Sequence, residues 1–87
     1  MLRNIRLFGA LKRFGTEGLL SIEMKNSRTA GELRAEVGQL LELNFPGESP
    51  SLLVGRSALV CDSRVLAQDE LVDAQGQLAL LPPVCGG

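Results

Sequence analysis

The sequence predicts one small α+β domain in which a mixed sheet of four to five strands packs on one main helix. Its 87 residues are enough for one hydrophobic core and too few for two. Hydrophobic residues make up 45% of the chain, and nearly all of them are aliphatic. One segment has the periodicity of an amphipathic helix, and β-like segments precede and follow it. The sheet must therefore lay one face on this helix.

Two strands are predicted before the helix, over residues 2–8 and roughly 18–24. In the first, apolar residues such as Ile5 and Leu7 stand among polar neighbours. Residues 9–15 begin and end with glycine, which leaves too few residues between them for a stable helix. We expect a loop or a single helical turn there, so that the two strands form an opening hairpin.

The helix has the clearest local signal. Thr29 and Glu32 have the spacing of a capping box, in which each side chain satisfies a free backbone N–H of the first turn. The helix should end by Asn44, before Pro46. Its apolar stripe is predicted to comprise Ala30, Leu33, Val37, Leu40 and Leu41.

After the helix, the sequence predicts a loop and two short strands. The prolines and glycine within residues 44–51 indicate the loop. Residues 57–61 have the pattern of a strand, and residues 62–63 suit the turn after it. A short return strand is expected to begin at residues 65–66.

Residues 77–81 form a last, mostly apolar strand, which favours a central position in the sheet. The polar residues 67–76 before it are turn-like, and we expect Leu71 and Val72 to anchor them to the core. The element order is thus β-β-α-β-β. With the first and last strands parallel neighbours in the centre, this order is the ubiquitin-like β-grasp arrangement.

The domain is predicted to comprise residues 1–81, followed by a flexible tail of residues 82–87. Two prolines at the start of the tail end the strand and favour an extended exit. Gly86 and Gly87 lack side chains and can pass through a channel that a Cβ atom would block. We expect the Gly87 carboxylate to be the ionised end of the protein, which adenylation by ATP would turn into an acyl donor.

Composition excludes several classes of function. The chain has no histidine, so it cannot supply an imidazole base or metal ligand, and two cysteines cannot make a four-thiolate metal site. A net charge of −1 and an aromatic content of 3% disfavour a nucleic-acid partner. No signal peptide or membrane-length apolar run is present, so we expect a cytoplasmic protein without a membrane partner. The chain is not expected to be an enzyme by itself.

Two segments resemble a known family. The ending Ala79-Leu80-Leu81-Pro82-Pro83-Val84-Cys85-Gly86-Gly87 resembles that of the small subunit of molybdopterin synthase, a member of the ThiS/MoaD-like sulfur carriers. The segment Leu7-Phe8-Gly9-Ala10-Leu11-Lys12 resembles the first strand and turn of the same family. The predicted order of elements agrees over essentially the whole chain, and the family has the ubiquitin-like β-grasp fold.

The resemblance implies a mechanism. In that family, a ubiquitin-activating-type adenylyltransferase uses ATP to adenylate the terminal glycine, and a sulfurtransferase supplies sulfur to form a thiocarboxylate. An acceptor enzyme, such as the molybdopterin synthase large subunit, then takes the sulfur. Carried over, Gly87 bears the thiocarboxylate and Gly86 gives it clearance, with no metal and no bound cofactor. The residues that would line the docking channel are Leu81, Pro82, Pro83, Val84 and Cys85.

Two departures from the family pattern leave the pathway open. Cys85 stands where a small residue is common, and residues 75–77 lack the usual acidic residues before the last strand. The same fold and tail also serve the thiamine, cysteine, methionine and siderophore pathways. Cys85 is either a small tolerated residue or a thiol close to the acyl centre that could take a persulfide.

Other functions remain as alternatives. The same tail permits a ubiquitin-like covalent modifier, and a plain interaction module would have the same fold. A thiol redox protein would use Cys61 and Cys85, although their spacing forms no CxxC motif, and Cys61 is expected to be a buried strand residue. Phe8 is either part of the core or, on an exposed sheet face, part of the surface that binds the activating enzyme. The basic residues Arg3, Arg6, Lys12 and Arg13 are expected to be solvated, and some could face an acidic partner.

Overall fold

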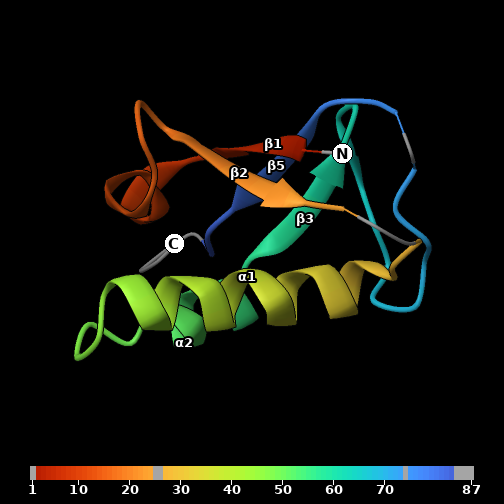
Figure 1. Ribbon diagram of the computed structural model, residues 1–87. Helices are drawn as coiled ribbons and strands as arrows, with labels where there is room; N and C mark the ends of the chain where they lie inside the picture. The colour runs from red at the N-terminus through yellow and green to blue at the C-terminus, as the bar shows by residue number, and fades with distance from the viewer. Residues whose placement is uncertain (1, 25–26, 74, 84–87) are drawn as a thin grey trace.

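The computed structural model describes residues 2–24, 27–73 and 75–83. Within these ranges it has five strands, two α-helices and one 3-10 helix (Figure 1). The strands are β1 (Leu2–Leu7), β2 (Leu19–Glu23), β3 (Ala58–Cys61), β4 (Arg64–Val65) and β5 (Leu78–Leu81). The helices are the 3-10 helix η1 (Gly9–Phe14), α1 (Ala30–Asn44) and α2 (Pro50–Gly55).

The strands form one mixed sheet in the order β2-β1-β5-β3-β4. β1 and β5 are parallel neighbours, with Leu7 paired to Leu80, and the other neighbouring strands are antiparallel. Both α-helices lie on one side of the sheet (Figure 1). This arrangement confirms the predicted β-grasp fold, with its five-stranded mixed sheet and one main helix.

The core lies between the sheet and α1. Burial alternates along β1, so that Ile5 and Leu7 face the helix and are at most 1% exposed. The predicted apolar stripe of α1 meets them, and four of its five members are buried. Leu40 differs from the prediction because it is half-buried, at the margin of the stripe.

The predicted start and end of α1 are confirmed. The Thr29 side chain accepts a hydrogen bond from the Glu32 N–H, and the Glu32 Oε1 accepts one from the Thr29 N–H at 2.9 Å. An N-cap of this kind contributes about 1 kcal/mol to helix stability. The last helical residue is Asn44, and the ring of Phe45, directly after it, packs edge-on against Phe14 with centroids 5.1 Å apart.

The predicted loop at residues 44–51 ends too late, because α2 begins within it at Pro50. Proline suits the first turn of a helix, where its missing N–H has no helical partner. Contacts with α1 hold this six-residue helix: Ser51 Oγ donates to Glu42 Oε2 at 2.6 Å, and a Cβ at Gly38 would lie 3.3 Å from the Ser51 Cβ. Isolated helices this short are not stable in water, so the sequence carries little signal for α2.

The segment before β5 is anchored by one of the two predicted residues. Val72 is buried, and its N–H donates to the Arg28 carbonyl at 2.8 Å. Leu71 was expected to be buried beside it but is 60% exposed. Consecutive residues in extended backbone point to opposite sides, so only one of the pair can face the core.

Candidate functional site

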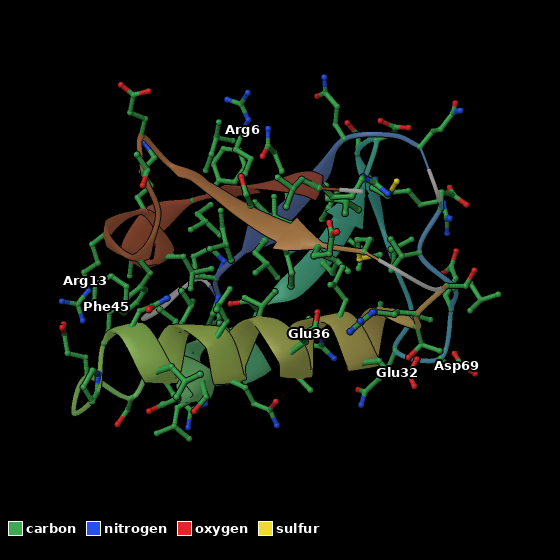
Figure 2. The ribbon with its side chains drawn as sticks, viewed as in Figure 1. Arg6, Arg13, Glu32, Glu36, Phe45 and Asp69 are labelled. Carbon is green, nitrogen blue, oxygen red and sulfur yellow. The ribbon has the colours of Figure 1, made fainter. Side chains whose placement is uncertain are left out.

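The outer face of the sheet, opposite α1, is left open by the described helices. Alternation along β1 places Asn4 and Arg6 on this face, and alternation along β5 places Ala79 and Leu81 there. A groove of about 780 Å³ follows this face. Figure 2 shows Arg6 on the side of the sheet away from α1.

One end of the open face is apolar. Phe8, directly after β1, Leu19 on β2 and Leu81 on β5 are 36%, 37% and 40% exposed, so three large apolar side chains reach solvent at this end of the sheet. Because Leu7 pairs with Leu80 in parallel register, Phe8 and Leu81 come at the same level of the sheet. Phe8 was predicted either as core or as docking surface, and the structure places it on the surface.

Arg6 lies beside this apolar end. It pairs with Leu19 of β2 on one side and with Ala79 of β5 on the other. No hydrogen bond or ion pair of its guanidinium is found among the residues that the structure describes. An exposed cation within an apolar surface fits a partner that brings a carboxylate.

The exit of the tail is fixed by a close contact between β5 and η1. Gly9 follows Phe8 and has a φ of +57°, and a Cβ at this position would lie 2.9 Å from the Cγ of Pro82. Pro82 is half-buried and Pro83 is exposed. The chain therefore leaves the domain beside the apolar end of the open face.

The other end of β5 is held by hydrogen bonds from neighbouring segments. Asp62 and Gln77 exchange two bonds, from Asp62 N to the Gln77 carbonyl at 3.0 Å and from Gln77 N to Asp62 Oδ1 at 2.9 Å. The Arg3 guanidinium donates to the carbonyls of Asp73 and Gly76 at 2.8 and 2.9 Å. Arg3 was expected to be solvated, but its position on the helix-facing side of β1 leaves it only 7% exposed.

Arg13 is exposed, as expected, and its guanidinium makes two contacts at the surface. Its guanidinium lies over the Phe14 ring at 4.6 Å from the centroid, and Nη1 is 2.5 Å from Glu48 Oε1. The ion pair with Glu48 joins η1 to the segment between α1 and α2. Among the basic residues considered for partner binding, Arg6 is the one that the structure places on the open sheet face.

Four of the predicted site residues, Val84, Cys85, Gly86 and Gly87, lie outside the described residues. The structure brings together the other predicted site residues, Phe8, Leu81, Pro82 and Pro83, at the tail exit. Sequence reasoning did not place Leu19 or Gly9 in this site, and it named Arg6 only as one of four basic residues of which some could face an acidic partner. The register of β1 with its two neighbours is what gathers them, and a local pattern does not reveal it.

Cys61 is a free, buried thiol on β3, as predicted. Burial raises its pKa above the ordinary value of 9.0, and the nearby carboxylates of Asp62 and Asp73 raise it further. A thiol with a raised pKa is a poor nucleophile at neutral pH, which weighs against the redox alternative.

The described ranges contain neither a metal-binding cluster nor a helix suited to cross a membrane. No group of three or more histidine, cysteine, aspartate or glutamate residues there could hold a metal ion. None of the helices in those ranges has the length and apolar character that a membrane crossing needs.

Comparison with known proteins gives structural neighbours only. No protein-family model matches the sequence, and no curated protein matches it. The crystal structure of SAMP1 from Haloferax volcanii is 27% identical with a TM-score of 0.64, and the comparison covers 100% of both chains. A chain in the complex of subunits 1 and 2 of the molybdopterin-converting factor from Helicobacter pylori 26695 is 25% identical with a TM-score of 0.59, again over 100% of both chains. Both are ThiS/MoaD-like β-grasp proteins, which confirms the resemblance found in the sequence.

Proposed function

We propose that this chain is a sulfur carrier whose C-terminal Gly87 carboxylate is adenylated and then converted to a thiocarboxylate. One observation carries the proposal. An open, partly apolar sheet face leads directly to Pro82 and Pro83, and the sequence given ends in two glycines. A partner that docks on the face would therefore receive the tail in a fixed direction.

The chemistry requires a carboxylate from this chain and catalytic groups from elsewhere. A Gly87 carboxylate oxygen attacks the α-phosphate of ATP, and pyrophosphate leaves. Sulfide can attack the acyl carbon of the adenylate, so that AMP leaves and the thiocarboxylate forms directly. When the nucleophile is the persulfide of a sulfurtransferase, AMP leaves and an acyl disulfide forms, and a second thiol then reduces its S–S bond to release the thiocarboxylate and a disulfide. The catalysts are a ubiquitin-activating-type adenylyltransferase and a sulfurtransferase, so the chain acts as a co-substrate and not as an enzyme.

The open face supplies the docking surface. Phe8, Leu19 and Leu81 would bury apolar area against the activating enzyme, while Arg6 would pair with a carboxylate of that enzyme. The residues from Leu81 to Cys85 would then lie in the channel that leads to the active site. Gly86 would allow the reacting carboxylate to pass the narrowest part.

The leading acceptor is the large subunit of molybdopterin synthase. The Helicobacter pylori neighbour is a chain in a complex of the two subunits of a molybdopterin-converting factor, and this chain aligns with it over its full length. That likeness supports a heteromeric synthase as the destination of the sulfur. Mixing the thiocarboxylated chain with a large subunit and a molybdopterin precursor tests this step by the appearance of molybdopterin.

The intact mass of untagged protein tests the central proposal. After incubation with an activating enzyme, ATP and inorganic sulfide, we expect one oxygen to be replaced by sulfur in the C-terminal peptide. A chain without Gly87 is the control, and it should fold normally and stay unmodified. In a parallel incubation with a sulfurtransferase that carries a persulfide, transfer of its outer sulfur to Cys85 would instead indicate persulfide chemistry, and lysine-linked conjugates would indicate a covalent modifier. An unmodified terminus would contradict the proposal.

A further inference from the structure

The side chains of the open face stand in rows that cross the strands. Arg6 of β1 pairs with Ala79 of β5, and Val60 of β3 pairs with Ala79 on its other side. Asp62 follows β3 and donates its N–H to the Gln77 carbonyl, so it belongs to the row two residues farther from the tail exit. Arg6 and Asp62 line the same groove. The face therefore has a cation near the tail exit and an anion farther from it.

The Asp62 carboxylate is held in a fixed position. Its Oδ1 accepts a hydrogen bond from the Gln77 N–H at 2.9 Å. A Cβ at Gly76 would lie 2.7 Å from the Asp62 Oδ2, so the absence of a side chain there leaves room for the carboxylate. Asp62 and Ser63 have φ angles of +49° and +70°, which are left-handed conformations that favour glycine or asparagine. The turn after β3 thus places this carboxylate on the open face in spite of backbone strain.

The fold does not need the charge of Asp62. The change Asp62→Asn would keep the shape of the side chain and an oxygen that accepts from Gln77, and asparagine tolerates the left-handed backbone. Among the described residues, none forms an ion pair with Asp62 or donates a hydrogen bond to its Oδ2. Arg64, just after the turn, pairs with Glu70 instead. The charge of Asp62 is therefore available to a partner.

Arg6 and Asp62 are too far apart to neutralise each other. One strand lies between β1 and β3, which separates the two residues by about 10 Å across the sheet, and the two-residue offset adds about 7 Å along it. Their separation exceeds the Debye length of about 8 Å at physiological ionic strength. Each charge can therefore take its own counter-charge from a protein that docks on the face.

We propose that Asp62 receives a basic side chain of the activating enzyme while Arg6 receives an acidic one. The proposal rests on the proposed function, because it takes that enzyme as the protein that docks on the open face. Two opposite charges define a direction on the face, and an enzyme turned by half a circle would place like charges together. The orientation that satisfies both charges is thus the one in which the tail exit faces the channel of the enzyme.

Steady-state adenylation kinetics of the Asp62→Asn variant test this proposal, with the adenylyltransferase that modifies the wild-type chain. We expect the KM for the carrier to rise about three- to tenfold while kcat stays the same, because one charged contact is lost and the tail is unchanged. The KM of the wild type should also rise more steeply with salt than that of the variant. Thermal denaturation should show that the variant is at least as stable as the wild type.

Asp69→Asn is the matched control. It removes the same charge from an exposed residue beside the start of α1, away from the open face (Figure 2). This variant should leave both the KM and its salt dependence unchanged. Equal KM values for the two variants would overturn the proposal and leave the sulfur carrier in place. A wild-type chain that stays unmodified would contradict the proposed function itself, and this proposal with it.

Discussion

Gly9 and Pro82 contact each other so closely that a β-carbon on Gly9 would lie 2.9 Å from the Cγ of Pro82. The two residues are 73 positions apart in the sequence, and the parallel pairing of β1 with β5 brings them together. Gly9 also has a φ of +57°, a conformation that side chains disfavour. One glycine thus permits both the turn into η1 and the position of the tail exit.

Gly9→Ala should destabilise the fold and displace the tail exit. The left-handed backbone costs about 1–2 kcal/mol for a residue with a side chain, and the overlap with Pro82 adds to it. We expect urea denaturation to show the loss of stability and the activation assay to show a raised KM for the carrier.

Gly47→Ala is the matched control for this change. Gly47 has a φ of +89°, and nothing lies within 4 Å of the position of its Cβ. The Gly47→Ala variant should lose stability because alanine disfavours the left-handed backbone, but its KM in the activation assay should not change. If the two variants had the same stability and the same KM, the contact with Pro82 would have no role in placing the tail.

The outline of the fold could be predicted because its signals are local. The Thr29–Glu32 capping box, the apolar stripe of α1 and the alternation along β1 each depend on residues within a few positions of one another. α2 escaped prediction because its stability comes from α1, through the contact of Ser51 with Glu42. Its own six residues carry too little helical preference to be recognised.

The candidate site was predictable at the tail and not on the sheet. The Pro-Pro and Gly-Gly pairs are adjacent in sequence, so their chemistry can be inferred directly. The gathering of Phe8, Leu19 and Leu81 depends on strand register and on which sheet face the helices cover. The same dependence explains Arg3, since its burial is decided by the face of β1 on which it falls.

Arg3→Met should be strongly destabilising, because its guanidinium satisfies the carbonyls of Asp73 and Gly76. Loss of these charged hydrogen bonds leaves partly buried acceptors without their donor, which we expect to cost about 2–4 kcal/mol. Urea denaturation measures the difference in free energy of unfolding.

Arg6→Met is the control at an outward-facing position three residues further along the same strand, and its effect on stability should stay within about 0.5 kcal/mol. In contrast, this variant should weaken binding to the activating enzyme. Equal losses of stability in the two variants would show that the burial of Arg3 does not matter.

The raised pKa of Cys61 predicts a loss of stability at alkaline pH. The folded protein keeps the thiol protonated above 9.0, whereas the unfolded chain releases the proton near that ordinary value. Above it the unfolded state binds fewer protons than the folded state, so the free energy of unfolding falls as pH rises until the folded pKa is passed. Well below pH 9.0 the thiol is protonated in both states, so its contribution to the free energy of unfolding does not change with pH.

Cys61→Ala tests this origin of the pH dependence. The variant should be less stable at neutral pH, because it leaves a cavity, but its stability should fall less between about pH 8 and about pH 10. Denaturation curves over this range measure both effects. A variant whose stability declined in parallel with that of the wild type would assign the pH dependence to other groups.

Leu81→Asp should separate docking from folding. Leu81 is 40% exposed on the open face at the tail exit, so a carboxylate there keeps its hydration in the free chain. On docking, the same carboxylate would be buried against an apolar partner, and we expect the KM for the activating enzyme to rise at least about tenfold while kcat changes little.

Leu71→Asp makes the same change at a side chain that is 60% exposed and distant from the face, and it should leave KM unaltered. Steady-state adenylation kinetics, with thermal denaturation to confirm folding, distinguish the two. An unchanged KM for Leu81→Asp would mean that the activating enzyme reads the tail alone, and the open face would then have to serve the acceptor enzyme or no partner.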